Sequence, residues 1–294
     1  MTVIEAIDSL FDVVSAVFAE APRQAPDHES NSRRFRKAIE RLINTRGIPL
    51  NAKMYEKTQP QPRCKVYVFS HANMLYLTLP SALYAAASAD IAQPYVFRTY
   101  SSRGSSLNPT IVDAICATIS VPSHFLPTKI MSRPVEHNFV GGPLGANNPT
   151  RELLKEADAT HGNDGRVTQI ISIGGGSSPV LSLDTMGGGG VGRLLVEMAA
   201  DCQMVAHELA ERLFNVESYT RLNSEKSAEN IEFGNWDTLG VVETRTRRYT
   251  ETPNVSNMLD ISLKSLRNKV GTITLGRLSK FLGCPFEFTA MGTD

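Results

Sequence analysis

The glycine run Gly187–Gly192 is the first stretch whose spacing could serve chemistry. Its sequence, Gly-Gly-Gly-Gly-Val-Gly, satisfies the G-x-G-x-x-G pattern of a dinucleotide loop, whose backbone approaches a pyrophosphate. That pattern also needs a strong strand before the loop and an acidic residue about 20 positions later, at the end of a second strand. Residues 180–186 form only a weak strand, and Glu211 falls inside an expected helix. We therefore interpret the run as a flexible hinge, with a phosphate- or oxyanion-facing loop as the alternative.

A zinc site and a serine nucleophile each have one partial match. His207–Glu211 begins like the zinc-protease helix, in which two histidines one turn apart bind the metal, but Glu211 replaces the second histidine. A serine hydrolase usually carries its nucleophile in Gly-x-Ser-x-Gly, on a strained turn before a helix. Ser177 and Ser178 come closest, and each lacks the second glycine. The sequence therefore predicts no catalytic, cofactor-binding or metal-ligating residue.

The segment Phe139–Thr150 is the most distinctive loop of the chain. It carries three glycines in five positions, at 141, 142 and 145, which favours a tight turn with close backbone approach. Asn148 is expected to cap the following helix, with Pro149 at its first position. We expect a loop-to-helix junction here. A further polar pair, Tyr219 and Arg221, is interpreted as solvated surface.

Along the chain, apolar residues recur with the spacing of helices in some segments and of strands in others. Strands separated by helical segments of ten or more residues indicate an α/β layered fold with a largely parallel sheet. From about residue 223 onward the pattern weakens, and Trp236 is expected in a loop. The expected strands are residues 65–70, 95–100 and 168–173, and the expected helices are residues 2–18, 33–45, 111–118, 193–214, 257–268 and 273–282.

The composition excludes several classes of protein. The 294 residues include 41% apolar and 20% charged residues, and 30 basic side chains balance 30 acidic ones, so nothing indicates nucleic-acid binding. The four cysteines are widely spaced, which favours a reducing compartment. No apolar run reaches the ~18 residues of a membrane span, and no signal peptide is visible, so we expect a cytoplasmic protein.

Several short motifs occur in order along residues 1–223. In this order they resemble the patatin-like phospholipase family, whose members are α/β lipid acyl hydrolases. We call them the landmark motifs. They are the helix Met1–Ile7, the strand Val66–Ser70, Pro94–Tyr100 (P-x-x-F-R-x-Y), Ala114–Phe125 (similar to A-x-x-A-T-S-A-A-P-x-x-F), Gly145–Thr150 (G-x-N-N-P), Ile171–Gly176 (similar to S-I-G-T-G) and Tyr219–Asn223 (Y-x-R-L-N).

The resemblance implies a fold and a chemistry. It implies an incomplete patatin-like three-layer fold over residues 1–223, with a mostly parallel central sheet flanked by helices, followed by a helical or irregular extension over residues 224–294. Family members use a serine–aspartate dyad and a glycine-rich oxyanion loop. The oxyanion loop and the serine elbow would precede the helix that begins this sequence, and Gly141 stands where the aspartate is expected. The resemblance therefore implies a lipid acyl hydrolase relative that is catalytically inactive.

Three functional alternatives remain open from the sequence. The chain is a patatin-like hydrolase relative without activity, a non-catalytic module that binds lipid or protein, or an α/β enzyme with an unrelated site around residues 174–192. The expected partners are a lipid or membrane surface and no nucleic acid, and no cofactor is expected. The wide apolar stripe of helix 2–18 and uncovered sheet edges also predict self-association.

Overall fold

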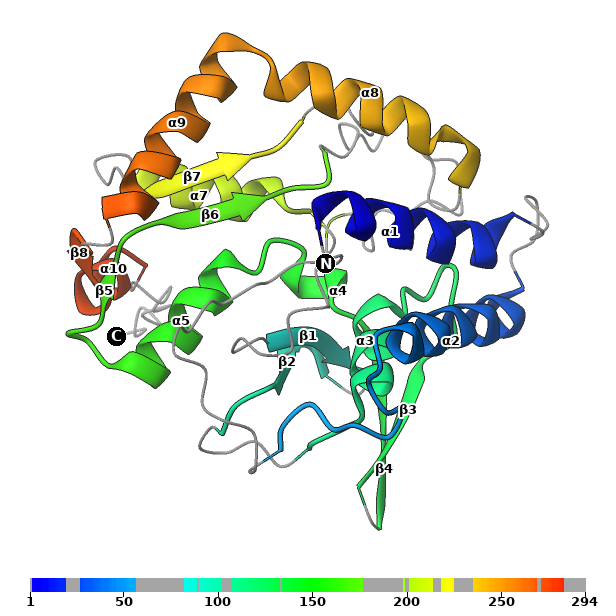
Figure 1. The fold of residues 1–294 in the computed structure, drawn as a ribbon. Helices are drawn as coiled ribbons and strands as arrows, with labels where there is room; N and C mark the ends of the chain where they lie inside the picture. The colour runs from blue at the N-terminus through cyan, green and yellow to red at the C-terminus, as the bar shows by residue number, and fades with distance from the viewer. Residues whose placement is uncertain are drawn as a thin grey trace, which may run out of the picture.

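The computed structural model describes residues 2–19, 27–56, 82–88, 90–101, 107–132, 134–176, 198, 201–213, 218–224, 235–268 and 271–282, which form a mixed α/β fold (Figure 1). The helices are α1 (Val3–Phe18), α2 (His28–Thr45), α3 (Ile111–Ile119), α4 (Pro143–Ala146), α5 (Thr150–His161), α7 (Gln203–Arg212), α8 (Leu239–Thr250), α9 (Pro253–Asn268), α10 (Leu275–Leu282) and the 3-10 turn η2 (Trp236–Thr238). The strands are β1 (Ala82–Ala87), β2 (Asp90–Arg98), β3 (Thr128–Ser132), β4 (Val135–Gly141), β5 (Arg166–Val167), β6 (Ile170–Ile173), β7 (Tyr219–Leu222) and β8 (Ile273–Thr274).

The largest sheet among the described residues is antiparallel, so the expected mostly parallel sheet is wrong for this part of the chain. Its four strands lie in the order β2-β1-β4-β3, and each neighbouring pair is antiparallel. Residues 88–89 join β1 to β2, and residues 133–134 join β3 to β4. Links of this length close hairpins, whereas a parallel pair needs a crossover of about a dozen residues or more. Parallel pairing is present between β6 and β7.

Strand β1 was not predicted from the sequence. Its run Ala85-Ala86-Ala87 favours helix by intrinsic propensity, yet Ala85 and Ala86 are buried in the sheet with β2 on one side and β4 on the other. The small side chain of Ala85 lets helix α3 pack closely on one face of the sheet, through the fully buried Ala114 and Ala117, while Ala86 points to the opposite face. Tertiary packing therefore overrides the local helix preference at this strand.

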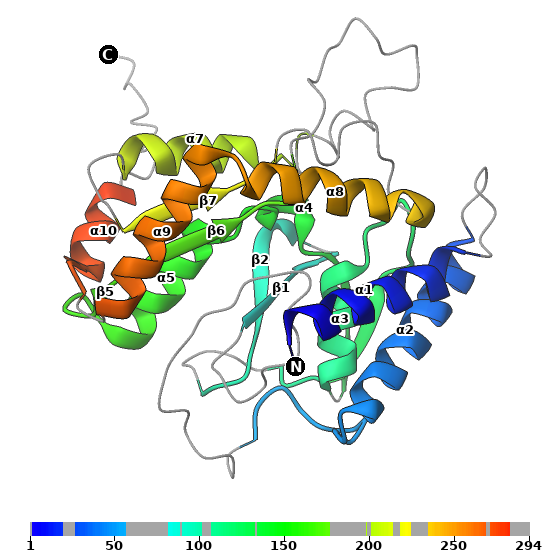
Figure 2. The same cartoon turned by 45° about the horizontal axis from the view of Figure 1, so that its top comes forward.

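A first hydrophobic core lies between this sheet and helices α1, α2 and α3. Figures 1 and 2 show α1 and α2 side by side, with α3 between them and the sheet. Ile43, Phe97 and Phe139 are fully buried in this core, and the two phenylalanine rings meet edge to face. Helix α1 begins with a capping box formed by Thr2 and Glu5.

A second core lies between α5, α7, α10 and the strands β6 and β8. Leu209 and Leu278 are fully buried there, and Leu154 and Ile170 pack against them. Helix α9 covers β7 from the other side, where Thr220 and Ser262 share a hydrogen bond of 2.7 Å. The last part of the described chain, through β8 and α10, thus packs on the elements around β6.

Most helices expected from periodicity are confirmed, with shifted ends. The helices expected at 2–18, 33–45, 111–118 and 257–268 correspond to α1, α2, α3 and α9. Helix α7 occupies part of the expected helix 193–214, and α10 occupies part of the expected helix 273–282. The expected strand 65–70 lies outside the described residues. Helix α8 was missed, because none of its residues is buried and it has no inward-facing apolar stripe. Among the described helices, none combines the length and apolar character needed to cross a bilayer.

Candidate functional site

The loop Phe139–Thr150 leads from the first core to the second. At its start the backbone is fixed to the end of α3, because the Gly141 N–H donates to Ser120 O (2.8 Å) and the Gly142 N–H to Thr118 O (3.0 Å). A Cβ on Gly142 would collide with the carbonyl oxygen of Tyr84 in β1. Gly142 therefore permits the close approach of two backbones, as its type predicts.

Gly141 ends β4 and occupies the position where the resemblance expects a general base. A Cβ there would lie 3.0 Å from Val121 Cγ2 and 3.1 Å from Val121 N, so a side chain would force its neighbours to move. The hydroxyl of Ser120 is committed elsewhere, since it donates to Cys116 O (2.6 Å) and shares a 2.7 Å hydrogen bond with Thr128. These residues provide neither a base nor an activated nucleophile at this position.

The middle of the loop packs on the sheet through short helix α4. Leu144 joins a buried cluster with Ala86 and Val140, and Ala146 joins another with Ala82 and Tyr84. Both clusters lie on the face of the sheet opposite α3. The loop therefore covers the second face of the four-stranded sheet.

The end of the loop forms a buried polar network with β6. Asn148 Oδ1 accepts hydrogen bonds from the Thr150 hydroxyl (2.7 Å) and the Thr150 N–H (3.3 Å). The Thr150 hydroxyl also lies 2.9 Å from Ser172 Oγ, to which Arg221 Nη1 donates (2.8 Å). The expected cap by Asn148 is wrong by one residue, because Pro149 is the N-cap of helix α5 and has no side-chain capping bond, while Asn148 binds Thr150 from one position earlier.

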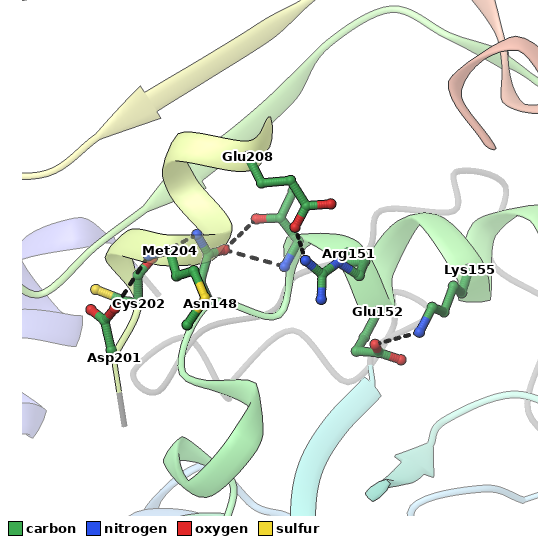
Figure 3. Close-up of polar contacts among 9 residues, drawn as sticks. Asn148, Arg151, Glu152, Lys155, Asp201, Cys202, Met204 and Glu208 are labelled. Atoms are coloured by element: carbon green, nitrogen blue, oxygen red, sulfur yellow. Dashed lines mark hydrogen bonds and ion pairs between the residues drawn. The ribbon is translucent and has the colours of Figure 1, made fainter. Parts of the chain in front are cut away.

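Figure 3 shows the surroundings of this network. Asn148 also donates to the carbonyl oxygen of Cys202, just before α7, at 3.4 Å. Arg151 on α5 pairs with Glu208 on α7, and Glu152 pairs with Lys155 along α5. The two helices are therefore fixed to each other and to the loop by polar contacts.

A second polar network joins β2 to α5. Arg98 donates through Nε and Nη2 to the two carboxylate oxygens of Glu156, at 2.6 and 2.7 Å. The Tyr100 hydroxyl donates to the same carboxylate at 2.6 Å. Burial of Glu156 disfavours its ionised form, but the hydrogen bonds from Arg98 and Tyr100 outweigh this and hold the pKa of the carboxyl below its ordinary value of 4.5.

Of the other stretches singled out in the sequence, the structure describes His207–Glu211 and the start of the glycine-rich region. Glu208 is engaged by Arg151, while His207 and Glu211 lie on the exposed face of α7, which makes this stretch a polar helix face. Within the described part of the chain, no group of three or more His, Cys, Asp or Glu side chains could hold a metal ion. Of the glycine-rich region, residues 174–176 are described, whereas residues 177–192, with both serines and the Gly187–Gly192 run, lie outside the described residues.

Arg221 is the residue that the sequence analysis misjudged most clearly. It was expected on the solvated surface, yet its guanidinium packs against Gly174 and binds a buried serine. The sequence contained a signal for this position. Arg221 lies in a short β-rich run with Tyr219 and Thr220, where a charged side chain can face the protein interior only beside polar partners. Glu156 gave no comparable signal, because it lies in a helix with other charged residues.

Landmark motifs that are far apart in sequence therefore meet around the loop. Residues of Ala114–Phe125 hold Gly141 and Gly142, those of Pro94–Tyr100 bind Glu156, and Ser172 and Arg221 connect Thr150 to β6 and β7. No protein-family model matches the chain, and a comparison with curated proteins found no significant match.

Proposed function

We propose that this chain is a patatin-like hydrolase relative that has the scaffold of a lipid acyl hydrolase without its catalytic dyad. The support comes from the contacts of the loop Phe139–Thr150, around which several of the described landmark motifs meet. The order of the motifs in the sequence supports the proposal, and so do the hydrogen bonds that join residues of several motifs to the loop or to helix α5. The topology of the described sheets does not contribute to this proposal.

The same loop argues against turnover. Gly141 supplies no carboxylate where a base is expected, and the sequence contains no Gly-x-Ser-x-Gly. Removing members of a catalytic unit of this kind typically lowers the rate by several powers of ten. The function we propose is therefore binding rather than hydrolysis.

A surface suited to binding is present on helix α1. Ile4 is 72% exposed, and Ile7 and Leu10 are also exposed, so the first half of the helix presents apolar side chains outward. Its second half is held in the first core by Val17. Because the resemblance is to lipid hydrolases, we propose a lipid surface as the partner of this face, with self-association as the competing outcome.

An esterase assay tests the absence of catalysis. The purified chain is expected to hydrolyse a short-chain p-nitrophenyl ester no faster than buffer, and Gly141→Asp is expected to remain inactive because a carboxylate alone restores no nucleophile. Activity that a serine-directed phosphonate abolishes would overturn the proposal.

Vesicle flotation tests the binding role. The chain is expected to float with anionic phospholipid vesicles, and Ile4→Glu with Ile7→Glu should abolish flotation. A matched control is Val241→Glu, which changes an exposed apolar residue on another helix, α8. Equal flotation of all three proteins would contradict a role for α1, and light scattering would show whether self-association occupies the face instead.

A further inference from the structure

Arg221 carries a charge whose hydrogen bonds are incomplete. Its Nη1 donates to Ser172, but its Nε and Nη2 atoms are shielded from solvent and meet no acceptor among the described residues. Buried N–H groups are nearly always paired, and an unpaired charged donor is especially costly. Such an edge indicates that an acceptor binds there.

The same chain shows what fits this edge of an arginine. In Arg98, the Nε and Nη2 atoms bind both oxygens of the Glu156 carboxylate side by side. Two parallel N–H···O bonds of this kind match a carboxylate or a phosphate group. The free edge of Arg221 is made of the same two atoms, so it has the geometry for the same type of partner.

The acidic side chains of Glu156 on α5 and Glu208 on α7 are already paired. Glu156 is held by Arg98 and Tyr100, and Glu208 by Arg151. Among the described residues, Arg221 forms no ion pair, and its hydrogen bond goes to the hydroxyl of Ser172, which carries no compensating charge. The positive charge of Arg221 is therefore left for a ligand.

The backbone around Arg221 leaves room for a close approach. A Cβ on Gly174 would lie 2.6 Å from Arg221 Nη2, so the glycine allows the guanidinium to lie against the chain. A Cβ on Gly175 would have nothing within 4 Å, so the backbone that follows β6 is uncrowded at this residue. Asn223 is held in place by the N–H of Gly176 (3.0 Å). These residues follow the carboxyl ends of the parallel strands β6 and β7, which is where α/β sheets commonly bind ligands.

We propose that the Nε–Nη2 edge of Arg221 binds an oxyanion, a carboxylate or phosphate group that offers two oxygens side by side. Ser172 fixes the other end of the guanidinium, and Gly174 provides the space for it. This site is separate from the dyad position at Gly141, so it does not depend on the hydrolase resemblance.

Thermal unfolding in the presence of small anions tests the site. Sodium phosphate and sodium acetate are added separately at low-millimolar concentrations, with sodium chloride keeping the ionic strength constant. At least one anion is expected to raise the Tm of the wild-type chain saturably, and the more effective anion identifies the ligand class. Arg221→Gln should remove this response, whereas Arg248→Gln, which changes an exposed arginine of α8, should retain it.

Two results would overturn the site. One is the absence of a saturable shift with either anion, and the other is an equal shift in Arg221→Gln, which would reveal a general salt effect. Should Arg221→Gln fail to fold, NMR of the wild-type chain labelled with ¹⁵N-arginine replaces it. An arginine Nε–H resonance that is protected from solvent exchange is then expected to change its chemical shift on addition of the effective anion. Unchanged arginine resonances would refute the proposal.

Discussion

Glu156→Gln is the substitution that best tests how the two cores are joined. The carboxylate of Glu156 accepts three hydrogen bonds, two from Arg98 and one from Tyr100, between 2.6 and 2.7 Å. The amide of glutamine has the same shape but only one acceptor oxygen, and its NH₂ group would face the hydrogen-bond donors of Arg98 or Tyr100. The change therefore removes the negative charge and at least one hydrogen bond without opening a cavity.

The expected loss follows from the burial of the pair. The side chains of Arg98 and Glu156 are 17% and 8% exposed, so solvent can replace little of the interaction. Hydrogen bonds to charged groups contribute about 1.5–3 kcal/mol each, and breaking a buried ion pair by removing one partner costs about 3–5 kcal/mol. We expect Glu156→Gln to lower the free energy of unfolding by about 3 kcal/mol.

Urea unfolding followed by circular dichroism measures this loss. The control is Glu152→Gln on the same helix, which removes an exposed partner of Lys155 and should cost less than about 1 kcal/mol. A double-mutant cycle with Arg98→Met isolates the pair, and its coupling energy should be about 2 kcal/mol. A loss below about 1 kcal/mol for Glu156→Gln, or no coupling to Arg98, would refute the conclusion that this pair joins the two cores.

Acid should remove the stabilisation that the ionised carboxylate of Glu156 provides. The folded-state pKa of Glu156 lies below its ordinary value of 4.5, since hydrogen bonds from Arg98 and Tyr100 outweigh burial. A carboxyl with a depressed pKa stabilises the fold above its unfolded-state pKa and loses that effect as pH falls through the folded-state pKa. The difference in unfolding free energy between wild type and Glu156→Gln should therefore be full at neutral pH and shrink once the pH is below about 4.5. A difference that stays constant under acid would contradict the assignment.

Two further predictions concern sterics and reactivity. Gly142→Ala should lower stability by about 1–3 kcal/mol because its Cβ would collide with the Tyr84 carbonyl, whereas Gly240→Ala, with nothing within 4 Å, should be neutral or slightly stabilising by thermal unfolding. Burial raises the pKa of the Cys116 thiol to about 12, against the opposing charge of Arg36, so iodoacetamide should leave Cys116 unmodified in the folded protein. Peptide mapping by mass spectrometry checks this, and rapid labelling of the native chain would show that the thiol is accessible.

The sequence predicted helices well where one face is buried and the other is not. Helix α2 illustrates this, since Phe35, Ile39 and Ile43 recur at helical spacing and all are buried. Elements whose burial does not follow a period were not predictable from the sequence. Strand β1 is covered by neighbours that the sequence cannot reveal, and α8 buries none of its residues.

The candidate site was harder to predict than the fold, for a physical reason. The close backbone approach at Gly142 was predictable because backbone geometry is a local property, whereas the N-cap of α5 is Pro149 and not the predicted Asn148. The partners of Thr150 and Glu156 were not predictable, since Ser172 and Arg98 approach them only after the chain has folded. Pairing between distant polar groups depends on packing that no local pattern encodes.

The contacts of the loop give structural reasons for its residues that do not require catalysis. Glycine at position 142 avoids a collision with the Tyr84 carbonyl, and Asn148 accepts a hydrogen bond from Thr150 at the start of α5. Neither contact involves a substrate or the position of a base. A carboxylate at Gly141 would in fact have to displace Val121. The loop can therefore keep its shape, and join the two cores, for reasons that hold whether or not a reaction takes place beside it.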